Sequence, residues 1–267
     1  MTYGALRRLG ITIVETVVSL AIVAGIWVAV LNTKDVSSYI AKTPTDVWNY
    51  LFSGAQAGAH RSDIGGLLAV TMGNAGLGLL SGVVGAVLVA MAFALAKPVE
   101  YMFMPLAMLL RTVPLLAMAP VIYIVFGNGK VTAALVGAVV VFFPILVNMA
   151  LGFRSVSSQL IDLIVVNGGN RWTVVTRAAL PAALPYFFAA LRIAVPGAIM
   201  AAMLYEWLFT YTGLGAGIVS AKTDSDYPKM WTITVVATIS SVLAYTITTA
   251  VESLVLERFI PDSGRRK

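Results

Sequence analysis

The sequence predicts an all-α polytopic membrane protein with about six transmembrane helices. Hydrophobic residues make up 59% of the 267 positions and charged residues only 11%, and the mean hydropathy is +0.90. Several stretches of about 20 residues carry few or no charges, and at about 1.5 Å per residue each can cross roughly 30 Å of hydrocarbon as a helix. Such stretches must be helical because lipid offers backbone polar groups no hydrogen-bond partners.

Composition also excludes several classes of function. The chain has no cysteine and a single histidine, His60, so disulfides, thiolate chemistry and histidine-based metal or acid–base sites are largely ruled out. A membrane enzyme is therefore disfavoured. The formal net charge of +6 is assigned to membrane topology rather than to nucleic-acid binding.

Residues 1–64 are expected to form an N-terminal transmembrane helix and an external segment. The first apolar run extends from about Ile11 to Leu31. It is too long for a signal peptide and lacks a small-residue cleavage site, so we assign it to the first span. The polar stretch that follows, about residues 32–63, is expected to hold a short interfacial helix.

Residues 65–255 form the predicted membrane core, and residues 256–267 a tail. The third span carries Pro105, Pro114 and Pro120, which predict kinks or breaks because proline lacks the N–H that a helix needs. The five expected spans of the core are about residues 65–96, 101–126, 131–152, 184–209 and 230–254.

Lysine and arginine near span ends favour the cytoplasmic side. The larger set of these residues lies on one side if both termini are cytoplasmic. The same orientation places the polar segment 153–183 in the cytoplasm. We therefore expect a multi-pass protein of the bacterial cytoplasmic (inner) membrane with both termini inside.

The segment 153–183 is the longest polar interruption within the hydrophobic part of the chain. Gly168 and Gly169 can adopt positive φ and turn the chain between two short helices. Pro181 and Pro185 are expected to limit how far a helix continues from this turn into the fifth span. The segment is therefore predicted to protrude as a helix-turn-helix.

This segment resembles the EAA loop of ABC importer permeases. In that family an acidic residue starts a short helix, glycine stands six positions later, and Leu-Pro closes the segment; here Asp162, Gly168, Leu180 and Pro181 match. The family's Glu-Ala-Ala is replaced by Asp-Leu-Ile at positions 162–164.

The resemblance extends over roughly residues 65–255. The proline-rich run from Arg111 to Pro120 and the Phe126-Gly127-Asn-Gly129-Lys130 turn look like the nitrate, sulfonate and taurine type of permease. Leu191-Arg192, Glu206-Trp207 and Gly213-Leu214-Gly215 also look like that group. The last two of these motifs look more like its vitamin-precursor branch.

The resemblance implies a type I ABC importer-like permease whose coupling helix docks on an ATPase. The docking residues would be Asp162, Asn167, Gly168, Gly169, Arg171, Leu180 and Pro181. The implied partners are two cytoplasmic ABC ATPase subunits, a second permease copy and an extracytoplasmic solute-binding protein, besides membrane lipid. A homodimer is expected, with a heterodimer of related permeases left open. ATP and Mg²⁺ would be bound by the ATPases, so this chain is expected to be neither an enzyme nor a holder of a cofactor.

Ionisable residues inside spans indicate function or pairing, because each costs about 2.5 to 3.5 kcal/mol at the helix centre on insertion scales. Arg111, Arg192 and Glu206 are candidates for lining the translocation path, with structural pairing as the alternative. Arg192 and Glu206 are 14 positions apart, about 21 Å along a helix, so they cannot pair within one straight span. Glu15 and Glu252 are expected to reach the interface or to hydrogen-bond to neighbours.

Three groups of glycines receive structural interpretations. Gly78 and Gly82 place small residues on one face and predict close helix packing, against another span or a second copy. The glycines at 213, 215 and 217 predict a flexible external loop. The Gly127–Lys130 turn lacks the residues of a phosphate-binding loop and is expected to join two spans.

Together these features predict an ATP-driven importer subunit that works by alternating access. The solute would be small: a sulfonate, nitrate, or an organic or heterocyclic nutrient such as a vitamin precursor. A secondary transporter with broken helices is the main alternative. The sequence shows no inverted repeat to support it, and this alternative gives segment 153–183 no function. An assembly factor remains open as well.

Overall fold

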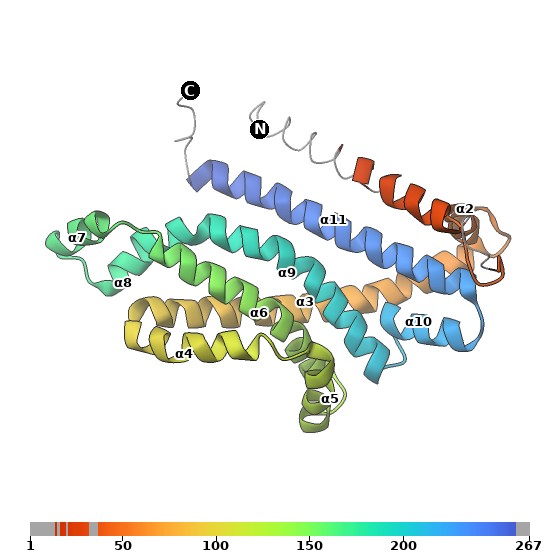
Figure 1. Cartoon of the computed structure of the whole chain (residues 1–267), viewed down its shortest axis with the longest axis horizontal. Coiled ribbons are helices and arrows are strands. Elements are labelled where there is room, and N and C mark those ends of the chain that lie inside the picture. The colour runs from red at the N-terminus through yellow and green to blue at the C-terminus, as the bar shows by residue number, and fades with distance from the viewer. Residues whose placement is uncertain (1–13, 15–16, 20, 32–36, 260–267) are drawn as a thin grey trace. The chain divides into compact units, whose positions relative to one another are not determined.

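The computed structural model describes residues 14, 17–19, 21–31 and 37–259, and every regular element among them is a helix. Figure 1 shows these helices with the labels used below. They are α2 (Pro44–Trp48), the π-helix η1 (Asn49–Ser53), α3 (Ala57–Leu95), α4 (Lys97–Leu110), α5 (Leu115–Phe126), α6 (Lys130–Arg154), α7 (Ser158–Val166), α8 (Arg171–Val174), the π-helix η2 (Val175–Ala179), α9 (Leu180–Phe209), α10 (Leu214–Thr223) and α11 (Tyr227–Phe259).

The long apolar helices confirm the prediction of a polytopic membrane protein. Within the described residues, four runs are long and apolar enough to span a bilayer, and the bent pair α4–α5 makes a fifth if it counts as one span. The expected first span, Ile11 to Leu31, lies partly outside the described residues, and its described residues 17–19 and 21–31 are helical. Six spans therefore stay a prediction. Glu15 also lies outside the described residues.

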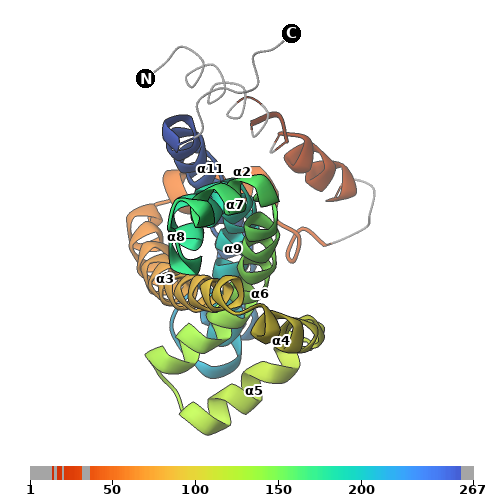
Figure 2. The ribbon, with the colours of Figure 1, turned by 90° about the vertical axis from the view of Figure 1, so that its left-hand side faces the viewer.

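The expected third span is divided into two helices that bend by 103°, as Figure 2 illustrates. Of the three prolines there, only Pro114 lies at the break, where it occupies the N-cap position of α5. A residue before proline is disfavoured in the α region, so Val113 cannot easily continue α4. Pro105 and Pro120 lie inside helices.

The chain divides into two compact units. Unit 1 comprises residues 1–74 and 202–246, and unit 2 comprises residues 75–201 and 247–267. In unit 1, Ile64 of α3, Leu214 of α10, and Ile233 and Ala237 of α11 form a buried apolar cluster. The ion pair between Lys229 Nζ and Asp63 at 2.7 Å joins the same parts of α3 and α11.

In unit 2, small residues let α3, α6 and α9 approach closely. A Cβ added at Gly78 would lie 2.6 Å from Gly137 Cα, and one at Gly82 would lie 2.6 Å from Val141 Cβ. A Cβ at Gly152 of α6 would lie 2.6 Å from Ala183 Cα of α9. The predicted close packing of Gly78 and Gly82 is confirmed, and the partner is another helix of the same chain.

Candidate functional site

The predicted helix-turn-helix of segment 153–183 is present as α7 and α8, which lie beyond the ends of α6 and α9 in Figure 1. Gly168 has φ of 84°. Its N–H donates to Val165 O at 2.9 Å, and the Gly169 N–H donates to Ile164 O at 2.9 Å. These two bonds form the Schellman motif that ends a helix at a left-handed residue.

Position 169 requires glycine because there is no room for a side chain, and not because of its backbone conformation. A Cβ there would lie 2.5 Å from Ile164 Cγ2 and 2.8 Å from Ile164 O. Asn167 adds a side-chain bond, because its Nδ2 donates to Leu163 O at 2.7 Å. The three residues 167–169 therefore set the direction in which the chain leaves α7.

α8 starts with a capping box and is tied to α3. The Asn170 side chain accepts from the Thr173 N–H at 2.9 Å, and the Thr173 side chain reaches back to the Asn170 backbone. Arg171 Nη1 donates to Leu95 O at 3.1 Å. Leu95 is the last residue of α3, so this bond satisfies a carbonyl that the helix end leaves free.

α7 carries apolar side chains but buries none of them. The side chains of Leu163 and Val166 are 59% and 86% exposed. Leu160, Val165 and, on α8, Trp172 are exposed as well. Exposed apolar clusters of this kind on a short helix mark contact surfaces.

Asp162, Leu180 and Pro181 differ in part from expectation. α7 begins at Ser158, with Ser157 as its N-cap, so exposed Asp162 lies inside the helix and does not start it. Leu180 and Pro181 begin α9. The prediction that Pro181 and Pro185 limit the helix is wrong, because α8, η2 and α9 form one run, Arg171–Phe209.

The π-helical turn η2 explains how this run passes the prolines. The Leu180 N–H donates to Val175 O, five residues back. A π-turn widens the helix by one residue, and this widening lies immediately before Pro181, whose missing N–H and ring disturb an α-helix.

Glu206 of α9 is buried in unit 1, with 0% of its surface exposed. Its carboxylate accepts from Thr71 Oγ1 at 2.7 Å, Asn74 Nδ2 at 2.9 Å and the Gly215 N–H at 3.1 Å. Thr71 Oγ1 in turn accepts from the Leu214 N–H at 2.8 Å. A buried carboxylate needs such donors, because removing them would leave it unsatisfied.

The glycines around this carboxylate do not form the predicted flexible loop, and that prediction is wrong. Gly213, with φ of 93°, precedes α10, whereas Gly215 and Gly217 lie buried inside it. A side chain at Gly213 would fall on the Glu206 carboxylate, and one at Gly215 on Met203 O. Gly213 and Gly215 thus allow close packing against α9, and Gly217 allows close packing against Leu67 of α3 and Ile233 of α11.

The other two path candidates have different surroundings. Arg192 Nε lies 3.0 Å from Glu252 Oε2, which joins α9 to α11 within unit 2. Arg111 is exposed at the end of α4, directly before the α4–α5 bend. Arg192 and Glu206 thus have separate partners, as their spacing predicts, and no contact in the described structure tests whether any of the three lines a path.

Sequence reasoning missed a charged cluster where α4 begins and α6 ends. Glu100 is 3% exposed and accepts from Arg154 Nε at 2.9 Å and from Arg154 Nη2. Lys97 Nζ lies 3.3 Å from the same carboxylate. The i,i+3 spacing of Lys97 and Glu100 could have indicated one of these pairs. Thr71 and Asn74 were also missed, and their shared face on α3 was the available signal.

The fold defines a polytopic α-helical membrane protein with a protruding helical hairpin. The chain belongs to the family described as binding-protein-dependent transport system inner membrane component, whose model matches residues 82–260.

Three relatives illustrate the range of the family. The riboflavin transport system permease protein RibX of Chloroflexus aurantiacus is 31% identical over 150 residues, which cover 56% of this chain and 54% of the relative. This match thus spans about half of the relative's length. The formylaminopyrimidine transport permease protein ThiX of Halalkalibacterium halodurans is 29% identical over 189 residues, 71% of this chain and 76% of the relative. The putative aliphatic sulfonates transport permease protein SsuC of Bacillus subtilis is 27% identical over 220 residues, 79% and 75% of the two chains.

Proposed function

We propose that this chain is the membrane-spanning permease subunit of an ATP-driven importer. In this proposal α7 and α8 dock on the ATPase subunits and transmit their movement to the spans. The observation that carries this proposal is the exposed apolar surface of α7 on a turn fixed by Gly168 and Gly169. A short helix that leaves Leu163 and Val166 uncovered needs a partner groove to bury them.

The connections of this segment suit it to transmit movement. α8 continues through η2 into α9 as one helical run, and Arg171 ties its start to the last carbonyl of α3. A displacement of the segment by a closing ATPase dimer therefore acts on two long helices at once. Such coupling of rigid elements to a closing partner is how alternating access is driven.

The proposal assigns the remaining roles to partners. Two cytoplasmic ATPase subunits bind ATP and Mg²⁺, a second copy of this chain completes the membrane part, and an extracytoplasmic binding protein delivers the solute. This chain is then a non-catalytic subunit of the bacterial inner membrane. Both termini and the α7–α8 segment face the cytoplasm, in agreement with the distribution of lysine and arginine.

We propose a small organic nutrient, and within that class a heterocyclic vitamin precursor, as the solute. Two relatives are named for riboflavin and formylaminopyrimidine transport, whereas others are named for sulfonate and nitrate. Uptake of labelled riboflavin, formylaminopyrimidine, an alkanesulfonate and nitrate, with and without the chain, separates these classes.

Co-purification tests the docking role. Leu163→Asp and Val166→Asp place a charge on the exposed apolar surface of α7 without disturbing any buried residue. Tyr211→Asp is the matched control, because Tyr211 is fully exposed and lies in unit 1. The tagged wild type and the control should retain an ATPase subunit in mild detergent, and the two α7 variants should lose it.

Two results would overturn the proposal. Retention of the ATPase by both α7 variants would remove the docking role from α7. A wild-type chain that purifies folded without any ATPase, yet supports uptake, would identify a secondary transporter instead.

A further inference from the structure

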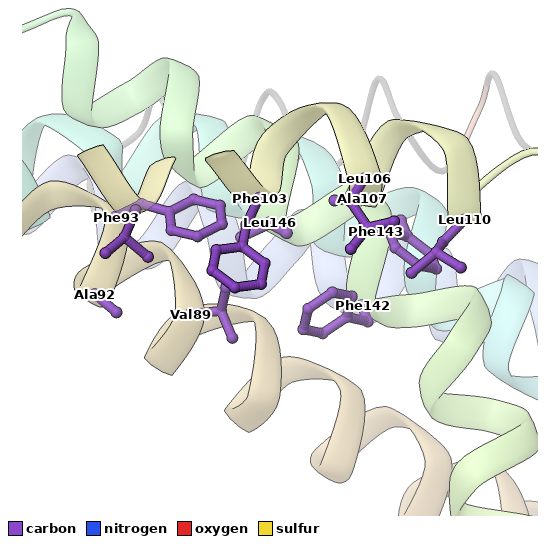
Figure 3. A pocket seen from close by; sticks show the side chains of 11 residues that line it. Val89, Ala92, Phe93, Phe103, Leu106, Ala107, Leu110, Phe142, Phe143 and Leu146 are labelled. Carbon is purple, nitrogen blue, oxygen red and sulfur yellow. The ribbon is translucent and has the colours of Figure 1, made fainter. Parts of the chain in front are cut away.

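An apolar groove of about 390 Å³ lies between α3, α4 and α6 in unit 2. Figure 3 shows it lined by Phe93 of α3, Phe103 and Leu110 of α4, and Phe142 of α6, among others. Every lining residue is apolar. A groove of this kind on the apolar surface of spanning helices offers no polar group to a water-soluble ligand.

Basic side chains stand at one end of this groove. Lys97 and Arg154 are 50% and 49% exposed in their side chains, while Glu100 between them is only 3% exposed. Val99 and Phe103, which line the groove, flank Glu100 on α4. Lys97 Nζ and Arg154 Nε and Nη2 donate to the Glu100 carboxylate, and one carboxylate with two half-exposed cations leaves an excess positive charge at the mouth of the groove.

The length of the groove corresponds to one leaflet of a bilayer. From Val99 to Leu110 the helix α4 advances about 16 Å at 1.5 Å per residue. Half of a hydrocarbon core of roughly 30 Å is about 15 Å. Lys97 and Arg154 lie at helix ends, where basic residues meet lipid headgroups.

We propose that this groove binds one acyl chain of an anionic phospholipid whose phosphate accepts hydrogen bonds from Lys97 and Arg154. The charged mouth complements a phosphate.

Native mass spectrometry of the transporter, purified with its partner subunits, tests the site with added phosphatidylglycerol or phosphatidylcholine of the same acyl chains. Lys97→Gln removes one cation and leaves the Arg154–Glu100 pair intact. Ala92→Phe fills the groove from an exposed position of α3. The matched controls are Lys130→Gln, at the other end of α6, and Ala69→Phe, also exposed on α3 but outside the groove.

The wild type should retain several times more phosphatidylglycerol than phosphatidylcholine. Lys97→Gln should lower this preference by about fivefold, the factor expected for one interfacial cation. Ala92→Phe should lower retention of both lipids, and both controls should match the wild type. Thermal unfolding of each variant separates loss of the site from loss of the fold.

Three results would overturn the proposal. The first is equal retention of the two lipids by the wild type. The second is a Lys97→Gln variant indistinguishable from Lys130→Gln. The third is cross-linking of Leu106→Cys, made in a chain that has no cysteine, to a second copy with a short thiol-reactive linker, which would show that the groove faces another subunit.

Discussion

Thr71 and Glu206 are 135 positions apart in the sequence and share a hydrogen bond of 2.7 Å inside unit 1. The same Thr71 hydroxyl accepts from the Leu214 N–H. One hydroxyl therefore links α3 to both α9 and the start of α10. In an apolar surrounding, each of these polar groups depends on the others for its partners.

Thr71→Val should lower the free energy of unfolding by about 1 to 3 kcal/mol, because the Leu214 N–H and one Glu206 oxygen lose a buried partner at unchanged side-chain volume. Thr223→Val is the matched control, since the Thr223 hydroxyl donates to Val219 O of its own helix, its one bond among the described residues. Denaturant unfolding in detergent measures both. Equal losses in the two variants would show that the linked hydroxyl contributes nothing beyond the substitution itself.

Glu206→Gln separates a structural role from the proposed role in the translocation path. The amide keeps the size of the side chain, but its single NH2 group must face either Asn74 Nδ2, which bonds Oε1, or the Gly215 N–H, which bonds Oε2, so some stability should be lost. The path hypothesis predicts that uptake per folded transporter also falls, and it predicts the same for Arg111→Gln. Uptake assays normalised to folded protein would refute it for either residue if uptake stayed at the wild-type level.

The sequence was sufficient to predict the fold class, the four long apolar helices of the membrane core and the turn at Gly168, because each depends on local composition or spacing. The three prolines predicted a break at one of three positions, and the sequence alone did not show that Pro105 and Pro120 lie inside helices while Pro114 lies at the break. The partners of Glu206 and Arg192 lie on other helices, so no spacing along the chain could indicate them.

The glycines at 213–217 and the proline at 181 depart from expectation for different physical reasons. The glycines at 213, 215 and 217 predict a flexible loop, but Gly213 and Gly215 pack against Glu206 and Met203, and Gly217 packs against Leu67 and Ile233. Pro181 predicts the end of a helix, but the helical run continues through it after the π-turn η2. Tertiary packing therefore overrides the local preference of the glycines, whereas a local change of helix type lets the run continue through Pro181.

Substitutions at Gly168 should loosen the α7–α8 turn according to the cost of positive φ. Gly168→Ala meets open space, so only backbone strain acts, about 1 to 2 kcal/mol. Gly168→Asn should cost less, since asparagine tolerates the left-handed region. Hydrogen exchange of residues 160–174 should therefore increase most in Gly168→Ala and less in Gly168→Asn. The same exchange in both variants and the wild type would contradict a turn held by Gly168.

The packing of α3 against α6 makes Gly78 and Gly76 a matched pair of positions. Gly78→Ala places a Cβ against the backbone of Gly137, so the helices must separate at a cost of about 1 to 3 kcal/mol. Gly76→Ala meets nothing within 4 Å and should be neutral or stabilising by up to about 1 kcal/mol. Thermal unfolding of the two variants gives the comparison. A Gly78→Ala variant as stable as Gly76→Ala would mean that the two helices part readily at this point.

The ion pair of Arg192 and Glu252 allows a double-mutant cycle that also tests the second path candidate. Arg192→Gln leaves the mostly buried Glu252 carboxylate without its cation, so we expect a larger loss of stability than in the double variant Arg192→Gln/Glu252→Gln. The coupling energy should be about 1 to 3 kcal/mol, less than for a fully buried pair because Arg192 is one-third exposed. Additive losses would show that the pair contributes nothing to stability.

Uptake by the same variants addresses the role of Arg192 in transport. If the arginine only balances Glu252, the double variant should recover both its stability and its uptake per folded transporter. The path hypothesis predicts a different result, in which stability recovers and uptake stays low, because the lost positive charge no longer meets the solute. The two readouts therefore distinguish a structural ion pair from a charge that lines the translocation path.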